Sequence, residues 1–172
     1  MQQVKLIVSN WKMNLGNKKA ARLVNNIKKL KNVHPNYKNI ICPQFLLIPH
    51  ISNLVNKSSV LLGAQDCHYQ KEGAYTGDTS IELLKENKCK YIIVGHSERR
   101  QYHKENDSII RKKVDLVLSK KIKPIVCVGE LLKERQSKRY VRIIKNQLDI
   151  CIPKNLNNIV IAYEPVWSIG TG

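Results

Sequence analysis

The chain alternates short apolar runs with longer amphipathic segments, and this alternation constrains the fold more than any other feature. The apolar runs are rich in Val and Ile and lack a period-two pattern, which is typical of strands buried on both faces. They cover residues 4–8, 39–42, 60–63, 91–94, 124–128 and 159–163. Apolar residues at helical spacing fill residues 20–30, 45–55, 81–84, 109–118 and 140–150. Successive strand–helix–strand units predict a parallel sheet.

Polar side chains follow several of the predicted strands. Asn10 and Lys12 come after the first strand, His96 after the fourth, Glu130 after the fifth and Glu164 after the sixth. This distribution favours a (β/α)8 barrel, in which the loops at the carboxyl ends of the strands build the active site. No Gly-x-Gly-x-x-Gly follows the first strand, which argues against a dinucleotide-binding open sheet.

The length of the chain limits how much of such a barrel it can form. A complete barrel has eight strands and about 250 residues, whereas this chain has 172 residues and six predicted strands. We therefore expect residues 1–172 to form a single α/β barrel domain with about six of eight units, incomplete at its C-terminal end. Unpaired outer strands would favour aggregation or recruit another chain.

The basic composition raises the question of acidic partners. The net charge is +17 and the isoelectric point is near 9.8, which suits phosphates or nucleic acid. The basic clusters are mostly interleaved with apolar residues at helical spacing, a pattern typical of solvated helix faces. Only 6% of the residues are aromatic, and no nucleic-acid recognition motif is apparent.

Five cysteines are scattered through the chain without a Cys-x-x-Cys pair. This pattern favours neither a disulfide framework nor a metal site, so we expect a reduced, cytoplasmic protein that holds no metal. No window approaches the ~18 apolar residues needed for a membrane span, and residues 1–14 do not form a signal peptide.

The first polar cluster, residues 9–14, places Lys12 at the rim of the core, where its ammonium group can face an anion. A surface lysine beside a capping asparagine explains the same spacing equally well. In the second cluster, residues 94–100, His96 ends a strand and Ser97 is expected to cap a short helix. A helix N-terminus disfavours the imidazolium form, which suits a neutral hydrogen-bond donor, although a structural histidine is the alternative.

Glu98, in the same cluster, could orient Lys12 or pair with Arg99 or Arg100. The third cluster is Tyr-Glu-Pro-Val-Trp-Ser-Ile-Gly-Thr-Gly, residues 163–172. The carboxylate of Glu164 would lie at the mouth of an apolar barrel, before a glycine-containing loop whose amides can approach a phosphate. A surface turn is the alternative, but two apolar side chains of the loop need a surface to cover.

Together these clusters, in this order, resemble the triosephosphate isomerase family over residues 4–172. Val-Gly-His-Ser-Glu-Arg-Arg and the third cluster are highly specific to it. The resemblance implies interconversion of dihydroxyacetone phosphate and glyceraldehyde 3-phosphate, a step of glycolysis and gluconeogenesis, through an enediol without cofactor. It implies that Glu164 is the base and His96 the neutral electrophile. Both roles, and the closure of a loop over the substrate, are general knowledge of this family.

The resemblance also implies roles for further residues. Lys12 and Asn10 would bind the substrate, the Gly170 amide would close over its phosphate, and Glu98 and Ser97 would support His96. Residues 65–78, with Tyr75 and Thr76 near the tip, resemble the loop that this family inserts into a second subunit, which implies a homodimer.

Four residues depart from the family pattern. They are Asp78 for Glu, Leu15 for Gly, Gln44 for Pro and Lys138 for Gly. A shorter carboxylate at position 78 would loosen the dimer.

The alternative function is an inactive fragment or a basic nucleic-acid-binding protein that uses the +17 charge.

Overall fold

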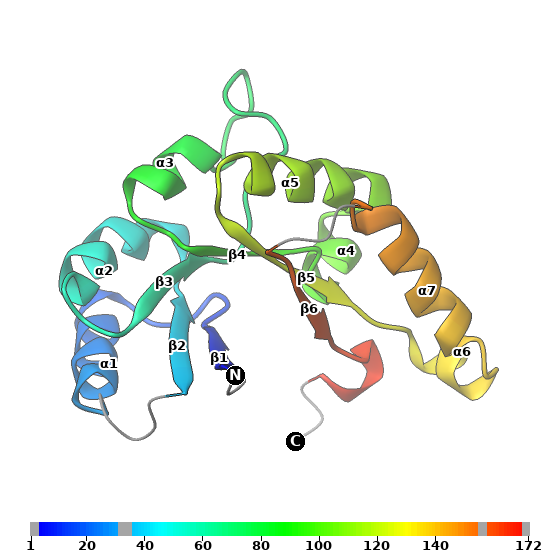
Figure 1. Ribbon diagram of the computed structural model, residues 1–172, viewed down its shortest axis with the longest axis horizontal. Helices are drawn as coiled ribbons and strands as arrows, with labels where there is room; N and C mark the ends of the chain where they lie inside the picture. The colour runs from blue at the N-terminus through cyan, green and yellow to red at the C-terminus, as the bar shows by residue number, and fades with distance from the viewer. Residues whose placement is uncertain (1–3, 31–35, 155–157, 170–172) are drawn as a thin grey trace.

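The computed structural model describes residues 4–30, 36–154 and 158–169, and six strands in these ranges form one parallel sheet. The strands pair in chain order, as the alternating pattern predicts. They are β1 (Lys5–Asn10), β2 (Tyr37–Cys42), β3 (Leu61–Ala64), β4 (Tyr91–Val94), β5 (Lys123–Val128) and β6 (Val160–Tyr163). Figure 1 shows that the sheet is curved and that the helices cover its convex side.

The five predicted helices are present, each within a few residues of its expected bounds. They are α1 (Asn17–Lys29), α2 (Ile48–Val55), α3 (Ile81–Glu86), α5 (Asp107–Ser119) and α7 (Tyr140–Cys151). The short helix expected after His96 is α4 (Ser97–Tyr102). The 3-10 turn η1 (Phe45–Leu47) forms the start of the segment predicted as a helix over residues 45–55. The periodicity did not predict α6 (Leu132–Gln136) or the 3-10 turn η2 (Val166–Ser168), because each is too short to show a helical repeat.

The central strands are buried on both faces. Ile92 of β4 and Val126 of β5 pack outward against the helices, in the same cluster as Ile110 of α5. The residues that alternate with them, Ile93 and Ile125, pack on the concave side in a second cluster. Because both faces of these strands need apolar residues, the sequence shows no period-two pattern there.

The prediction that all six strands are fully buried is wrong for the two outer strands. Ile7 of β1 is 47% exposed, and Ile161 and Tyr163 of β6 are 43% and 50% exposed. Among the described residues, each of these strands pairs with a neighbour on one side only. The apolar composition of an outer strand therefore matches that of a central one although its burial does not.

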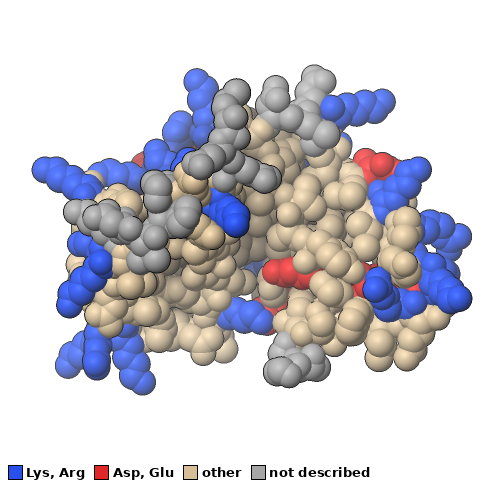
Figure 2. Space-filling model, turned by 60° about the horizontal axis from the view of Figure 1, so that its bottom comes forward, with Lys and Arg blue, Asp and Glu red and all other residues tan. Residues whose placement is uncertain are grey.

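The surface chemistry follows the helix faces. Lys18 and Lys19 of α1 and Lys112 of α5 are exposed, as the interleaved pattern predicts. The prediction is wrong for Lys113 of α5, which is buried. Figure 2 shows that the described Lys and Arg side chains lie mainly around the margins of the face in view, with a hollow between its two halves. In the part of the chain that is described, no helix has the length and apolarity to cross a membrane.

Candidate active site

Four charged or polar side chains meet at the carboxyl ends of β1, β4 and β6. Lys12 Nζ lies 2.9 Å from Glu98 Oε1, and Glu98 Oε2 lies 3.4 Å from His96 Nδ1. On the other side of the ring, His96 Nε2 lies 3.5 Å from Glu164 Oε2. Residues separated by about 150 positions in the chain therefore form one continuous row.

His96 lies in the interior and its ring orientation is fixed. The side chain is 5% exposed, and Nδ1 accepts a hydrogen bond of 3.2 Å from the Glu98 backbone N–H. Because that bond uses the lone pair of Nδ1, the proton of the neutral ring is carried by Nε2 and points toward Glu164. The ring is thus prepared to donate a hydrogen bond to a ligand at that point.

The helix cap differs from the prediction. We expected Ser97 to cap α4, but the N-cap residue is His96, and its imidazole supplies the capping acceptor. Ser97 is the first helical residue and lines a small pocket together with Glu164 and Cys127. Histidine is an uncommon capping residue, so the serine was the natural choice from sequence.

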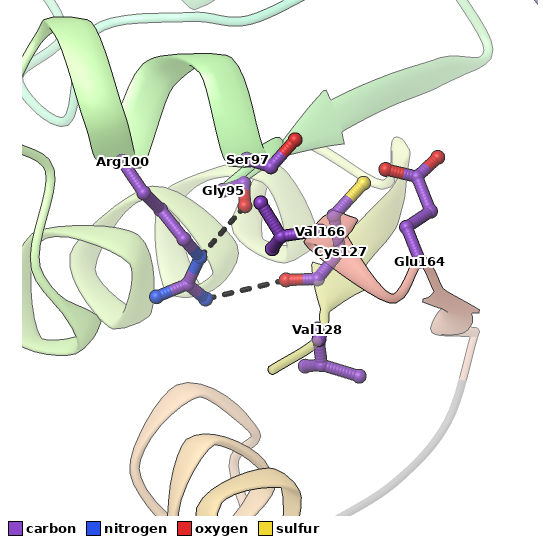
Figure 3. A pocket seen from close by; sticks show the side chains of 8 residues that line it. Gly95, Ser97, Arg100, Cys127, Val128, Glu164 and Val166 are labelled. Atoms are coloured by element: carbon purple, nitrogen blue, oxygen red, sulfur yellow. Dashed lines mark hydrogen bonds between the residues drawn. The ribbon is translucent and has the colours of Figure 1, made fainter. Parts of the chain in front are cut away.

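Glu98 resolves an alternative that the sequence left open. Its carboxylate pairs with Lys12, and the two arginines that follow it face other partners. Arg100 donates hydrogen bonds to Gly95 O at 2.8 Å and Cys127 O at 3.2 Å, as Figure 3 shows. Arg100 therefore links the ends of β4 and β5 beneath the site, a role that sequence reasoning missed.

Glu164 is held at the end of β6 by its backbone. Its N–H donates to Val128 O at 2.8 Å, and Gly129 packs so closely that an added Cβ would lie 1.9 Å from Glu164 O. The Oε2 atom is buried and accepts no hydrogen bond from the described residues. In Figure 3 the Cys127 thiol lies beside this carboxylate. Burial, together with the Glu164 charge, raises the pKa of Cys127, so the thiol stays neutral.

Glu130 anchors the segment that follows Glu164. Its side chain is fully buried and accepts hydrogen bonds from Trp167 Nε1 at 3.0 Å and Tyr163 OH at 3.1 Å. Burial alone would raise the pKa of Glu130, but these hydrogen bonds hold it below its ordinary value. The sequence placed Glu130 after β5 without a role. Trp167 was a possible signal for this role, because its indole N–H needs an acceptor and Glu130 could supply one.

Lys12 stands on a turn tied to β1, β2 and β3. Its N–H donates to Asn10 Oδ1 at 2.9 Å, and its carbonyl accepts from Gln65 Nε2 at 2.9 Å. The ammonium group is 38% exposed and lines a cavity with Asn10, His96 and Glu98. Gln65 was not predicted as a site residue, because its amide contacts the backbone of the turn.

A buried ionic cluster lies beside this cavity. Lys113 Nζ lies 2.7 Å from both Asp66 Oδ2 and Glu105 Oε1, and Arg99 pairs with the same two carboxylates. Burial raises the pKa of Asp66 to about 6 despite the cations. Burial also acts on Glu105, but the hydrogen bonds and charges of Lys113 and Arg99 lower its pKa. No sequence motif indicated this cluster.

The remaining predicted residues lie apart from the row of charged groups. Tyr75 and Thr76 are on the loop between β3 and α3, which projects from the body of the molecule in Figure 1. The ring of Tyr75 stacks on His68 at 4.0 Å between centroids. Gly170 lies outside the described residues. Within the described ranges, no group of three or more His, Cys, Asp or Glu is placed to hold a metal ion.

The family model, the relatives and a solved structure all indicate the same family. The model of the family described as triosephosphate isomerase matches residues 5–172. Triosephosphate isomerase of Aquifex aeolicus is 42% identical over 98% of this chain and 69% of its own length. The enzyme of Alkaliphilus oremlandii is 41% identical over 97% and 68%. The crystal structure of triosephosphate isomerase from Bartonella henselae matches 95% of this chain and 69% of that chain, with 36% identity and a TM-score of 0.89.

Proposed function

The chain belongs to the triosephosphate isomerase family, which interconverts dihydroxyacetone phosphate and D-glyceraldehyde 3-phosphate, and from this premise we propose the residues that perform the reaction. The relatives favour the isomerase over a basic nucleic-acid-binding protein. The observation that carries the proposal is the row Lys12–Glu98–His96–Glu164, in which the buried imidazole lies between two carboxylates and the cation pairs with one of them.

Glu164 acts as the base. Its carboxylate removes a proton from C1 of dihydroxyacetone phosphate, and the electrons of that bond form the double bond of the enediol. The carboxyl group so formed then donates a proton to C2, while a proton passes from the C1 oxygen to the C2 oxygen. Because the carboxyl proton can exchange with water in between, it need not be the one that was removed. A carboxylate whose Oε2 is buried and accepts no hydrogen bond from the described residues can accept a proton without first breaking a strong contact.

His96 acts as the electrophile. Its Nε2–H donates a hydrogen bond to the carbonyl oxygen where negative charge develops, and the Nδ1 contact with the Glu98 N–H keeps the donor in place. Ser97 and Glu98 support this orientation. Since acid–base side chains supply every proton movement, the reaction requires no cofactor.

Lys12 and Asn10 bind the substrate. The Lys12 ammonium group lines the cavity beside His96, and it neutralises the phosphate and the developing oxyanion. The Gly170 amide completes the phosphate contacts when the loop closes. Glu98 Oε1 holds the ammonium group at 2.9 Å.

Steady-state kinetics in both directions with the purified chain test these roles. We expect Lys12→Met to raise KM at least tenfold and His96→Gln to lower kcat at least tenfold, because the first removes a phosphate contact and the second moves the donor. Lys18→Met and His50→Gln, on exposed faces of α1 and α2, are the matched controls. Unchanged KM and kcat in the site variants would refute the assignment.

We further propose a cytoplasmic homodimer. Met13 and Tyr102, which line the cavity of Lys12, are 88% and 68% exposed, and Leu46, next in sequence to the lining residue Phe45, is 95% exposed. Together they form an apolar rim that suits a second subunit. The projecting loop with Tyr75 and Thr76 enters this rim of the partner, where Thr76 supports Lys12. The five cysteines are free and buried, which fits a reducing compartment.

Light scattering coupled to size exclusion tests the dimer. Thr76→Arg places a bulky charge at the loop tip, so we expect the dissociation constant of the dimer to rise at least a hundredfold. Gln70→Arg, exposed in the same loop, adds the same charge away from the tip and is the control. A wild-type chain that stays monomeric at high concentration would overturn the proposal.

A further inference from the structure

The turn that carries Lys12 contains two non-glycine residues in the left-handed region of the backbone. Lys12 has φ of 50° and Leu15 has φ of 71°. This region is unfavourable for a residue with a Cβ atom, and it persists only where neighbouring groups hold it. The Leu15 side chain packs against the main core cluster, which fixes one side of the turn.

The other side of the turn is held by the side-chain amide of Gln44. Its Nε2 donates to Asn14 O at 2.9 Å and to Leu15 O at 3.3 Å. The backbone of Gln44 is itself fixed, because its carbonyl accepts a hydrogen bond of 2.9 Å from Leu47 N–H at the start of η1. A rigid donor thus faces two consecutive carbonyls of the strained turn.

These contacts reach Lys12 through the turn. Asn14 Nδ2 donates to Trp11 O at 2.9 Å, so a shift of Asn14 moves the residue directly before Lys12. Gln65 holds the Lys12 carbonyl from the side of β3. The ammonium group is therefore placed by two glutamine amides, one at each end of the turn.

We propose that Gln44 is a positioning residue for substrate binding, which acts by holding the Leu15 turn so that Lys12 faces the phosphate. The inference rests on the proposed role of Lys12. The side chain at position 44 contacts the backbone at position 15 directly. Its amide holds a φ that a glycine at position 15 would adopt without strain.

Calorimetric titration of the 172-residue chain with sn-glycerol 3-phosphate, which lacks the reacting carbonyl, tests the proposal. Gln44→Met keeps the length of the side chain and removes the donor, so the dissociation constant should rise about fivefold, the effect of one lost neutral hydrogen bond. Gln44→Glu should raise it further, because a carboxylate would face two carbonyl oxygens. Gln136→Glu, exposed at the end of α6, controls for the added charge.

A rescue separates positioning from a general loss of structure. Gln44→Lys keeps a donor of similar reach toward the two carbonyls, so its affinity should stay within about twofold of the wild type, with Gln136→Lys as the control for the added charge. Hydrogen exchange at the Lys12 amide, which needs no ligand, should be faster in Gln44→Met and normal in Gln44→Lys.

The outcomes are distinguishable. A wild-type chain that does not bind the phosphate ester overturns the proposed function, and the exchange measurement still decides whether Gln44 holds the turn. Binding by the wild type with equal affinity in Gln44→Met overturns the positioning role alone. A lowered melting temperature with unchanged affinity and exchange would reduce Gln44 to a structural residue and refute the inference.

Discussion

The central and the outer strands of the sheet contribute different kinds of groups to the site. The central strands β4 and β5 are buried on both faces, and the residues after them, His96 and Glu130, are buried too. The outer strands β1 and β6 are partly exposed, and they carry Lys12 and Glu164, which are 38% and 36% exposed. The hydrogen-bond donor His96 is therefore fixed in the interior, whereas the cation Lys12 and the base Glu164 lie on the outer strands.

This difference shows how a rigid centre can position groups on less buried strands. Glu164 is held by contacts to Val128 and Gly129 of the β5 end, and the turn of Lys12 is held from β2 and β3. The outer groups therefore depend on backbone contacts with the centre more than on their own burial. Changes at those contacts should affect the site more than changes of similar size elsewhere.

The largest effect is expected at the base itself. Glu164→Asp retracts the carboxylate by one methylene, so kcat should fall about a hundredfold or more while stability is nearly unchanged, since the side chain is only partly buried. Glu86→Asp, exposed on α3, is the control. Isomerase assays and urea unfolding measure the two quantities, and an unaltered kcat would remove Glu164 from the role of base.

The second largest effect is expected from a change that weakens the contact between the outer strand β6 and the end of β5. Gly129→Ala places a methyl group against the carbonyl of Glu164, and backbone cannot yield as a side-chain tip can, so we expect a loss of about 3 kcal/mol in the free energy of unfolding. Hydrogen exchange should accelerate in β6 before it does in β4. Gly16→Ala, where an added Cβ meets nothing within 4 Å, should cost far less. Equal losses in both variants would contradict the close packing.

The next prediction concerns the pH dependence of stability, which arises from the buried ionic cluster of Asp66 and does not involve the outer strands. Burial raises the pKa of Asp66 in the folded protein from its ordinary 3.8 to about 6. The stabilisation from its protonated form is therefore fully present below pH 3.8 and is lost as the pH rises through 6. Asparagine has no carboxyl group to titrate, so the variant lacks this pH-dependent contribution. The free energy of unfolding of the wild type, relative to Asp66→Asn, should therefore rise by about 2 kcal/mol from pH 7 to pH 4. Parallel pH profiles from urea unfolding would contradict the raised pKa.

The smallest effect is expected at the link between the centre and the segment after β6. Glu130→Gln keeps the shape but replaces a charged acceptor by a neutral amide, which weakens the hydrogen bonds from Trp167 Nε1 and Tyr163 OH and should cost about 1 kcal/mol. The fluorescence of Trp167 should shift relative to the wild type. Glu134→Gln, in α6, is a control that lacks contact with Trp167. An identical emission spectrum in Glu130→Gln would show that the carboxylate does not hold the indole.

The sequence predicted the order of the elements well, because apolar runs buried on both faces and amphipathic helices have distinct patterns. It did not distinguish the outer strands from the central ones. Ile7 and Ile161 are as apolar as Ile92, and their exposure depends on how many neighbours each strand has. That property belongs to the sheet and is invisible in a single segment.

For the site, the polar residues after the strands identified the reacting groups, whereas their supports were missed. His96 accepts from the Glu98 N–H of its own helix, whereas Arg100 and Gln44 donate to backbone carbonyls of other segments. Such contacts need only a backbone N–H or carbonyl, which any sequence offers. Charge and spacing give them no recognisable motif.

The central claim is that Glu164 transfers a proton at a triose phosphate held between Lys12 and His96. The most direct test is incorporation of solvent deuterium into dihydroxyacetone phosphate by the purified chain in D2O, followed by proton NMR. The account predicts that the wild type exchanges a C1 hydrogen and that Glu164→Ala does not. Equal exchange by both proteins, or none by the wild type, would contradict it.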